Sequence, residues 1–479
     1  MLFKSGENGG IEDLGLGLRW AAPDLAAQVN DRAAVLAAAD LAPGATIVIA
    51  HSGTAHFFAD LLAVWERGCC AVCLDTALTP GETTRLIDFV RPAAVLAGAA
   101  ELKVGADVPV LRLAHARAAA AAPPCPPAAP EQPALVLFTS GTTGDPKGVV
   151  LSFGALGNRL ALNRQHSGPA CRRRTLVTLP TSFGHGLIGN ALTPLLSGGD
   201  IVLHPPGLGL AQNLGRLIDR HEIVFLSSVP AMWRLALKFS GPPAGATLKR
   251  VHVGSAPLAP ELWRAIAEWT RAEVVNCYGV TELANWVSGA SSRRDGIAEG
   301  AVGRPWGGDS AIIDANGAIS ATGAGELVIK SPSVMSGYLH RPDLTEAAFI
   351  RGWYRTGDAA RLTDDGLIHL TGRIKDEINR AGLKVQPGEI DALLQSHPAV
   401  AEACAFGIAD AVSGETVAVA VCFAPGANAT IEALKAWCAA RLRREAIPER
   451  WFLVDKLPRN ERGKISRAAV RRALIGAVE

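Results

Sequence analysis

The sequence predicts an α/β protein with a large N-terminal domain, built of parallel sheets with crossover helices plus a small β-barrel-like part, and a small α+β C-terminal domain. A chain of 479 residues is too long for one ordinary hydrophobic core, so two or more domains are expected. Between residues 46 and 276, short apolar runs alternate with amphipathic stretches, a pattern typical of parallel sheets. From Gly300 the strands become shorter, with Gly-rich turns, which indicates a smaller and more antiparallel part.

The first elements follow from apolar runs that are separated by amphipathic stretches. Strands are expected at residues 46–50, 71–74 and 94–96, and a helix at residues 55–66. The Ala- and Pro-rich segment 115–133 is expected to be a semi-rigid connector that leads to a strand at residues 134–138. Beyond it, helical patterns at 211–220 and 260–271 alternate with strands expected at residues 174–179, 201–203, 223–226, 250–253 and 273–276.

The C-terminal part has a different pattern of apolar and polar residues. Alternating strands are expected at residues 310–313, 325–329 and 367–371. From Lys375 on, the chain mixes strands with helices, the strands at 401–407 and 416–423 and the helices at 387–396 and 430–444. We therefore expect two domains, residues 1–374 and 375–479.

Composition narrows the class of protein. Apolar residues make up 49% and charged residues 19%, which fits a compact globular chain. A formal charge of +2 gives no broad field that would favour nucleic acid or anionic lipid. Cys70 and Cys73 form a CxxC in an apolar stretch and are expected to be buried, so the nine cysteines indicate a reduced, cytoplasmic protein. No signal peptide or membrane span is expected, because the N-terminus lacks a basic-then-apolar pattern and no apolar run approaches eighteen residues.

The most informative local pattern is "TSGTTGDPKG" at residues 139–148, which follows an apolar strand. Glycine-permitted dihedrals let several backbone N–H groups form a concavity for phosphate oxygens, and hydroxyls and one lysine add donors. A Walker A loop would need GxxxxGK[ST] leading directly into a helix, and this spacing does not match it. A plain Gly/Thr turn is the alternative. We expect a triphosphate site.

This loop and four further motifs, in the same order, resemble those of the AMP-forming acyl-CoA synthetases, the adenylate-forming superfamily. The four are "NCYGVTE" at 276–282, "YRTGD" at 354–358, "GRIKDEINRAGLKVQPGEID" at 372–391 and "PRNERGKISR" at 458–467. The resemblance covers the chain from about residue 45 to its end. The first 45 residues match less well, so substrate entry or a homodimer contact is expected to differ there.

The resemblance implies an ATP site with Mg²⁺. Phosphates are expected on Thr281 and on the loop residues Thr139, Ser140, Gly141, Thr142, Thr143, Gly144 and Lys147. Glu282 is the expected Mg²⁺ ligand, since a carboxylate suits a hard cation. Asp358 is expected on the ribose and Arg373 near ribose and phosphate. The adenine pocket is expected to comprise Gly254, Ser255, Ala256, Asn276, Cys277, Tyr278 and Gly279.

The resemblance also implies a mobile C-terminal domain. Lys464, at a Gly-permitted turn, is the expected catalytic residue that reaches the substrate carboxylate and the α-phosphate. Lys375 is the expected hinge. After the domain turns, Gly382, Leu383 and Lys384 are expected to line the tunnel through which the thiol of coenzyme A enters.

The acyl pocket is expected to involve the stretch "LPTSFGHGLIGNAL" at 179–192. Phe183 or His185 is expected to touch the substrate, although a structural loop histidine is an equal alternative. Val229, Val280 and Trp286 are expected to line the rest of an apolar slot, together with small residues of the nucleotide site. No acid occurs between Leu179 and Asn190, so an α-amino acid substrate is disfavoured.

We therefore predict an ATP-dependent carboxylate–CoA ligase for an aryl or short- to medium-chain acid. The acid would form acyl-AMP with release of pyrophosphate, and coenzyme A would then take the acyl group. One alternative keeps the adenylation but passes the acyl group to a carrier-protein phosphopantetheine or an amine. A catalytically silent nucleotide-binding regulator is disfavoured, because all five expected charged site residues are present: Lys147, Glu282, Asp358, Arg373 and Lys464.

Overall fold

The computed structural model describes residues 8–39, 41–98, 108–117, 122–139, 147–169, 172–205, 207–314, 316–380, 383–410, 414–427, 429–459 and 465–476. The chain forms two compact units, each described by itself below. Unit 1 is Met1–Ser310 with Ile329–Tyr354, and unit 2 is Ala311–Val328 with Arg355–Glu479. The predicted boundary after residue 374 falls within unit 2 and stays a prediction.

The first sheet of unit 1 has seven strands in the order β19-β8-β7-β4-β3-β5-β6. Its strands β7, β4, β3, β5 and β6 run parallel, and β8 and β19 are antiparallel additions at one edge. Runs such as "CAVC" in β4 are buried along their whole length, as expected for a parallel sheet covered on both faces. The bounds are β3 (Thr46–Ile49), β4 (Cys70–Cys73), β5 (Ala94–Leu96), β6 (Val110–Leu111), β7 (Pro133–Thr139), β8 (Lys147–Ser152) and β19 (Gly337–Tyr338).

The second sheet of unit 1 has the order β15-β14-β13-β12-β11-β9-β10-β1-β2. The strands from β13 to β1 in this order are parallel, and both ends close with antiparallel neighbours. The bounds are β1 (Ile11–Asp13), β2 (Leu18–Trp20), β9 (Arg174–Val177), β10 (Asp200–Leu203), β11 (Phe225–Ser228), β12 (Arg250–Gly254), β13 (Glu273–Val280), β14 (Asn285–Ser291) and β15 (Ala301–Pro305).

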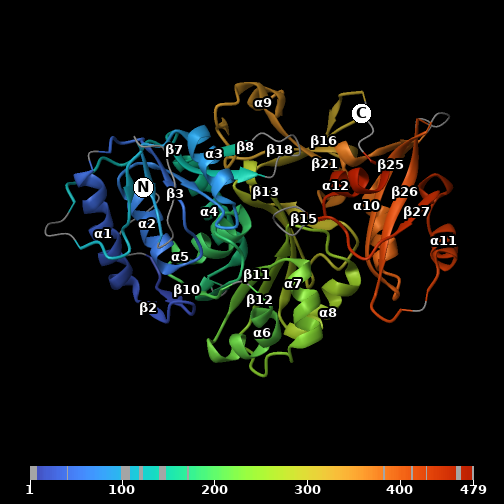
Figure 1. Ribbon diagram of the computed structural model, residues 1–479, viewed down its shortest axis with the longest axis horizontal. Coiled ribbons are helices and arrows are strands. Elements are labelled where there is room, and N and C mark those ends of the chain that lie inside the picture. The colour runs from blue at the N-terminus through green and yellow to red at the C-terminus, as the bar shows by residue number, and fades with distance from the viewer. Residues whose placement is uncertain are drawn as a thin grey trace. The chain divides into compact units, whose positions relative to one another are not determined.

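Helices cover both faces of this second sheet. Figure 1 shows α6 (Leu208–Arg220), α7 (Pro230–Phe239) and α8 (Pro260–Thr270) beside β11 and β12. Leu214, Trp233 and Trp263 from these helices pack with apolar residues of the strands in one core cluster. Helix α4 (Phe153–Ser167) and the π-helical turn η2 (His185–Leu192) contact strands of the second sheet, and α4 also contacts β7 and β8 of the first. Helix α4 and η2 thus lie against the face that carries Phe225 and His252.

Hydroxyl residues mark the start of several helices. A Ser or Thr side chain at the N-cap accepts a hydrogen bond from a backbone N–H of the first turn, which satisfies one of the unpaired donors there. This occurs at Thr54 before α2 (Ala55–Glu66), Thr79 before α3 (Pro80–Val90), Ser152 before α4, Thr430 before α11 (Ile431–Ala439) and Ser466 before α12 (Arg467–Ile475). The remaining helices of unit 1 are α1 (Ala22–Ala38), α5 (Thr193–Leu195) and α9 (Pro342–Ala347).

Unit 2 begins with antiparallel strands in the order β17-β16-β18-β21-β22. They are β16 (Asp309–Ile313), β17 (Ile319–Ser320), β18 (Gly323–Lys330), β21 (Trp353–Leu362) and β22 (Ile368–Arg373). The short strand β20 (Phe349–Ile350) pairs with the start of β21. This meander matches the smaller antiparallel part that the sequence predicts.

The rest of unit 2 is an α+β layer. Its sheet has the order β24-β23-β26-β25, with β27 beside β26, and the strands are β23 (Ile378–Arg380), β24 (Leu383–Val385), β25 (Val400–Asp410), β26 (Gly414–Phe423) and β27 (Arg450–Leu453). Alternate residues face opposite sides. Val417, Val419 and Val421 pack with α10 (Pro387–Gln395) and α11, whereas Ala418 and Ala420 pack with α12. No helix among the described residues is both long and apolar enough to cross a bilayer.

Candidate active site

The predicted phosphate loop joins β7 to β8. Thr139 and Lys147 are opposite each other in this antiparallel pair. The loop residues Ser140, Gly141, Thr142, Thr143 and Gly144 lie outside the described residues. Lys147 is half-buried, and its Nζ lies 5.8 Å from the centre of the Tyr338 ring. The pairing of β7 with β8 thus fixes the backbone position of Lys147. The face of the Tyr338 ring attracts the charge of the lysine side chain.

Tyr338 also holds the carboxylate of Glu282. Its hydroxyl donates a hydrogen bond of 2.8 Å to Glu282 Oε1. Tyr338 lies on β19, directly opposite Val149 of β8, and Glu282 lies in the short turn η3 (Thr281–Leu283) after β13. The Glu282 carbonyl accepts a further bond from Met335 N at 2.7 Å. One side chain therefore contacts both the predicted phosphate-binding lysine and the predicted metal ligand.

The three tyrosines of the chain all gather around Glu282: Tyr278, Tyr338 and Tyr354. The Tyr354 hydroxyl donates to the Tyr338 oxygen, and Tyr338 donates to Glu282. Burial, followed by the nearby Glu282 charge, raises the pKa of both Tyr338 and Tyr354. Both phenols consequently stay protonated at neutral pH and remain hydrogen-bond donors.

The geometry around Glu282 is compatible with one metal-binding carboxylate rather than a protein cage. Among the described residues, no three His, Cys, Asp or Glu side chains gather in a group that could hold a metal ion. Mg²⁺ is commonly bound by one or two carboxylates together with substrate phosphates. Glu282, kept in place by Tyr338, fits that mode.

The predicted adenine pocket occupies the ends of β12 and β13. Gly254 is opposite Cys277, and a Cβ added at Gly254 would lie 2.7 Å from the Cys277 carbonyl oxygen. Ser255 has a left-handed φ of 65°, so the chain turns sharply there. Asn276 Nδ2 donates to the Ala301 carbonyl at 2.8 Å, which leaves the amide oxygen as its second polar group. Ala256 follows the turn and is exposed.

His185 is a buried part of this region. Its Nε2 lies 2.5 Å from Ser227 Oγ and its Nδ1 lies 2.8 Å from Ser255 Oγ. The Ser227 hydroxyl donates to the carbonyl oxygen of His252 at 3.3 Å, so its oxygen accepts from His185 Nε2–H and the Ser255 hydroxyl donates to Nδ1. His185 thereby ties η2 to the turn after β12.

The other predicted acyl-pocket residues are partly brought together. The ring centres of Phe183 and Trp286 lie 5.9 Å and 5.5 Å from that of His185. Val229 precedes α7, and Val280 ends β13; both are partly buried. The structure adds residues to which the sequence had assigned no role. Ser227 lies beside His185, and His252 and Trp306 lie beside Trp286. Tyr338 and Tyr354 lie around Glu282. Tyr354 opens the motif "YRTGD", whereas only the rarity of tyrosine offered a signal for Tyr338.

Asp358 and Arg373 form the predicted pair in unit 2. They are opposite each other on β21 and β22, and Arg373 Nε lies 2.6 Å from Asp358 Oδ1. The turn before Asp358 is fixed by Glu326, which accepts from Gly357 N at 3.1 Å and pairs with Arg355 at 2.7 Å. Asp358 is nearly buried, whereas Arg373 is about half exposed.

Of the remaining predicted residues of unit 2, the structure describes some and leaves others outside the described part. Lys375 lies in the 3₁₀ turn η4 (Ile374–Asp376) between β22 and β23, and Leu383 is exposed at the start of β24. Lys384 is on β24, but its side chain lies outside the described part, as do Gly382 and Lys464. Arg459 and Ile465 pair across the segment that carries Lys464.

Comparison with known proteins places the chain in a family. A model of the "AMP-binding enzyme" family matches residues 17–339, and a model of the "AMP-binding enzyme C-terminal domain" matches residues 389–464. An oxalate–CoA ligase of Arabidopsis thaliana is 34% identical over 346 residues, covering 71% of this chain and 67% of that enzyme. The match thus spans about two thirds of that relative. ScoC of Streptomyces coeruleorubidus, a fatty acid–[acyl-carrier-protein] ligase, is 31% identical over 467 residues, covering 92% and 89%.

Solved structures agree with the sequence matches. O-succinylbenzoate CoA synthetase (MenE) from Bacillus subtilis, in complex with its acyl-adenylate intermediate, has a TM-score of 0.86 and 25% identity. The alignment covers 97% of this chain and 95% of that one. The same Bacillus enzyme has been solved with ATP and magnesium ion. The predicted fold class and the predicted resemblance are confirmed, and the chain belongs to the family of AMP-binding enzymes, the adenylate-forming superfamily.

Proposed function

We propose that this AMP-binding enzyme joins a carboxylic acid to AMP and then transfers the acyl group to the thiol of coenzyme A. A carboxylate oxygen attacks the α-phosphorus of ATP, the bond between the α-phosphorus and its bridging oxygen breaks, and pyrophosphate leaves. The thiolate then attacks the carbonyl carbon, and AMP leaves with the oxygen that came from the acid. The mixed anhydride makes the carbonyl reactive toward a modest nucleophile.

The observation that carries this proposal is the convergence of Lys147 and Glu282 on Tyr338. A lysine after a Gly/Thr loop can neutralise phosphate oxygens, and a carboxylate at the end of a parallel strand can bind Mg²⁺. Bound Mg²⁺ would neutralise the triphosphate and polarise it toward attack. The residues of this chain supply the ligand, the charge and the hydroxyls that orient them.

Unit 2 supplies the remaining groups of the proposed site. Asp358, held by Arg373, can accept hydrogen bonds from the two ribose hydroxyls. Lys464 would neutralise the carboxylate and the α-phosphate, because their approach brings two anions together. In the proposed cycle, rotation at Lys375 removes Lys464 after adenylation and brings the segment with Gly382, Leu383 and Lys384 to the thiol.

A carrier-protein thiol is a second candidate acceptor. The relative ScoC, whose alignment covers 92% of this chain, is an acyl-carrier-protein ligase by name, and this favours keeping that candidate. The two acceptors differ in their second half-reaction only. Supplied acyl-AMP should be consumed by free coenzyme A in the first case, and only by a phosphopantetheine-bearing protein in the second.

Acid-dependent exchange of labelled pyrophosphate into ATP tests the first half-reaction. We expect exchange that requires the acid, Mg²⁺ and Lys464, and that is lost in a Lys464→Ala variant. ATP binding without acid-dependent exchange would instead favour a silent nucleotide-binding protein. The buried cysteines, which the structure describes as free thiols, support a cytoplasmic location for this activity.

A further inference from the structure

The second sheet of unit 1 carries a layer of four rings on the face that meets η2. We call Phe225, His252, Trp286 and Trp306 the aromatic layer. The Trp286 ring centre lies 4.5 Å from that of His252, 6.4 Å from Phe225 and 6.2 Å from Trp306. All four side chains are buried. All three contacts are edge-to-face, an arrangement that aromatic rings favour in packed interiors.

Glycine occupies the two backbone positions that face the indole rings of the aromatic layer. Gly189 of η2 faces Trp286, and a Cβ added there would lie 2.8 Å from the indole ring. Gly289 of β14 faces Trp306, and an added Cβ would lie 2.4 Å from that ring. Each indole therefore rests against a glycine, since any side chain at these two positions would collide with it. The aromatic layer fills the space between strand and η2.

The layer also ends close to the predicted reacting carboxylate. The Trp286 ring centre is only 5.5 Å from that of His185, which hydrogen-bonds Ser255 at the nucleotide-binding turn. A substrate that enters beside His185 would meet the indole after a few atoms. An aryl ring or a medium-length chain would have to displace packed aromatic side chains.

Two side chains of the layer have hydrogen-bonding groups without a partner among the residues that the structure describes. His252 is fully buried, yet neither ring nitrogen has a hydrogen-bond partner, and Trp286 Nε1 has none either. Buried polar groups are normally paired, so an unpaired set needs an explanation. Burial lowers the pKa of His252, so the ring is neutral and offers one N–H donor; the indole N–H is a donor only. The group that would satisfy both is an oxygen acceptor.

We infer that the acid taken by this enzyme is short, about two to four carbons long, and carries a second oxygen that accepts hydrogen bonds from His252 and Trp286. This inference rests on the proposed function and narrows its substrate class. A hydroxyl, a carbonyl or a second carboxylate shares this acceptor chemistry. The layer sets the length limit, and the two unpaired N–H groups set the preference for oxygen.

A panel of acids scored by pyrophosphate exchange tests the inference. Plain short acids (acetate, propionate) are compared with short hydroxy and oxo acids (glycolate, lactate, glyoxylate), with malonate, and with benzoate and octanoate. We expect the best oxygen-bearing short acid to exceed acetate and propionate by at least about tenfold in kcat/KM, because unpaired polar groups of a site discriminate strongly. Benzoate and octanoate should be lower still. The ranking among hydroxy acids, oxo acids and malonate shows whether a hydroxyl, a carbonyl or a second carboxylate is the preferred acceptor.

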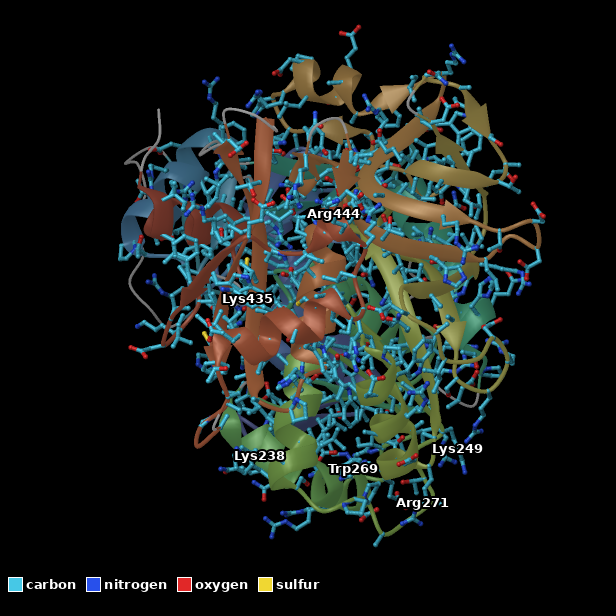
Figure 2. The ribbon with its side chains drawn as sticks, turned by 90° about the vertical axis from the view of Figure 1, so that its right-hand side faces the viewer. Lys238, Lys249, Trp269, Arg271, Lys435 and Arg444 are labelled. Carbon is cyan, nitrogen blue, oxygen red and sulfur yellow. The ribbon has the colours of Figure 1, made fainter. Side chains whose placement is uncertain are left out.

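Variants of Trp286 separate the two parts of the inference. Trp286→Gly should raise kcat/KM for benzoate by about tenfold or more, because it opens the layer. Trp286→Phe keeps a ring but removes the N–H, so it should lower kcat/KM for oxygen-bearing acids more than for propionate and lose much of the preference between them. If the glycine variant does not fold, the phenylalanine variant still tests the donor. Trp269→Phe is the matched control: Trp269, labelled in Figure 2, lies on α8 and donates its N–H to Ser240 O.

The outcomes are distinguishable. Exchange with benzoate or octanoate as rapid as with short acids would overturn the length limit, and equal rates for acetate and every oxygen-bearing acid would overturn the second contact. Absence of exchange with all acids would overturn the proposed function, and this inference with it. Loss of the preference in the Trp269→Phe control would also count against it.

Discussion

The most specific prediction concerns Tyr338, whose hydroxyl links Tyr354 to the Glu282 carboxylate. Tyr338→Phe removes that hydroxyl and leaves the ring that faces Lys147. A hydrogen bond to a charged acceptor contributes about 1.5–3 kcal/mol, and the buried Tyr354 hydroxyl would lose its acceptor as well. Groups that orient a metal ligand typically change metal affinity or activity by about 10- to 100-fold when removed. We therefore expect Tyr338→Phe to raise the Mg²⁺ concentration for half-maximal exchange by about that factor.

The assay is pyrophosphate exchange measured against Mg²⁺ concentration at saturating acid and ATP. Tyr354→Phe is the graded control, because it keeps the bond from Tyr338 to Glu282 and removes only the donor behind it. Its effect should be smaller, about fivefold, as for one ordinary hydrogen bond. A merely structural role for Tyr338 would lower thermal stability without moving the Mg²⁺ dependence. An unchanged Mg²⁺ dependence in a folded Tyr338→Phe protein would refute the reasoning.

Three further outcomes are expected. Lys464→Ala should abolish adenylate formation and leave thioester formation from supplied acyl-AMP largely intact; equal damage to both half-reactions would contradict the hinge role of Lys375. Because burial lowers the pKa of His252, the unfolded chain gains its proton first, so stability falls as pH drops below about 6.5. His252→Phe should remove that part of the acid sensitivity in denaturant titrations, and an unchanged pH dependence would count against it. Burial raises the pKa of Cys69 to about 11 and of Cys70 to about 12, so a thiol reagent should label half-buried Cys125 before either; early labelling of Cys70 would contradict the fold.

Much of the fold could be read from local patterns. The strand expected at residues 46–50 is β3 (Thr46–Ile49), and the helix expected at 387–396 is α10 (Pro387–Gln395). Elements marked by a buried apolar run or a capping residue are decided locally, which is why their positions agree. The helix expected at 430–444 ends earlier, at Ala439, because Arg441 N and Leu442 N both bond to the Cys438 carbonyl and tighten the chain there.

The site was predictable where one motif carries the chemistry and less so where distant segments meet. Asp358 and Arg373 lie fifteen residues apart, and a single antiparallel pair brings them together. Tyr338 reaches Glu282 only because β19 joins the edge of β8, a pairing between segments nearly two hundred residues apart. The aromatic layer likewise joins β11, β12, β14 and the turn after β15. Such contacts depend on sheet order, which a single sequence does not specify.

The transfer of an acid oxygen to AMP tests the central claim most directly. The substrate acid, labelled with ¹⁸O in its carboxylate, is incubated with the enzyme, ATP, Mg²⁺ and coenzyme A, and the AMP formed is weighed by mass spectrometry. Attack of the carboxylate on the α-phosphorus predicts AMP that carries one labelled oxygen. Unlabelled AMP, or ADP with phosphate in its place, would contradict the account.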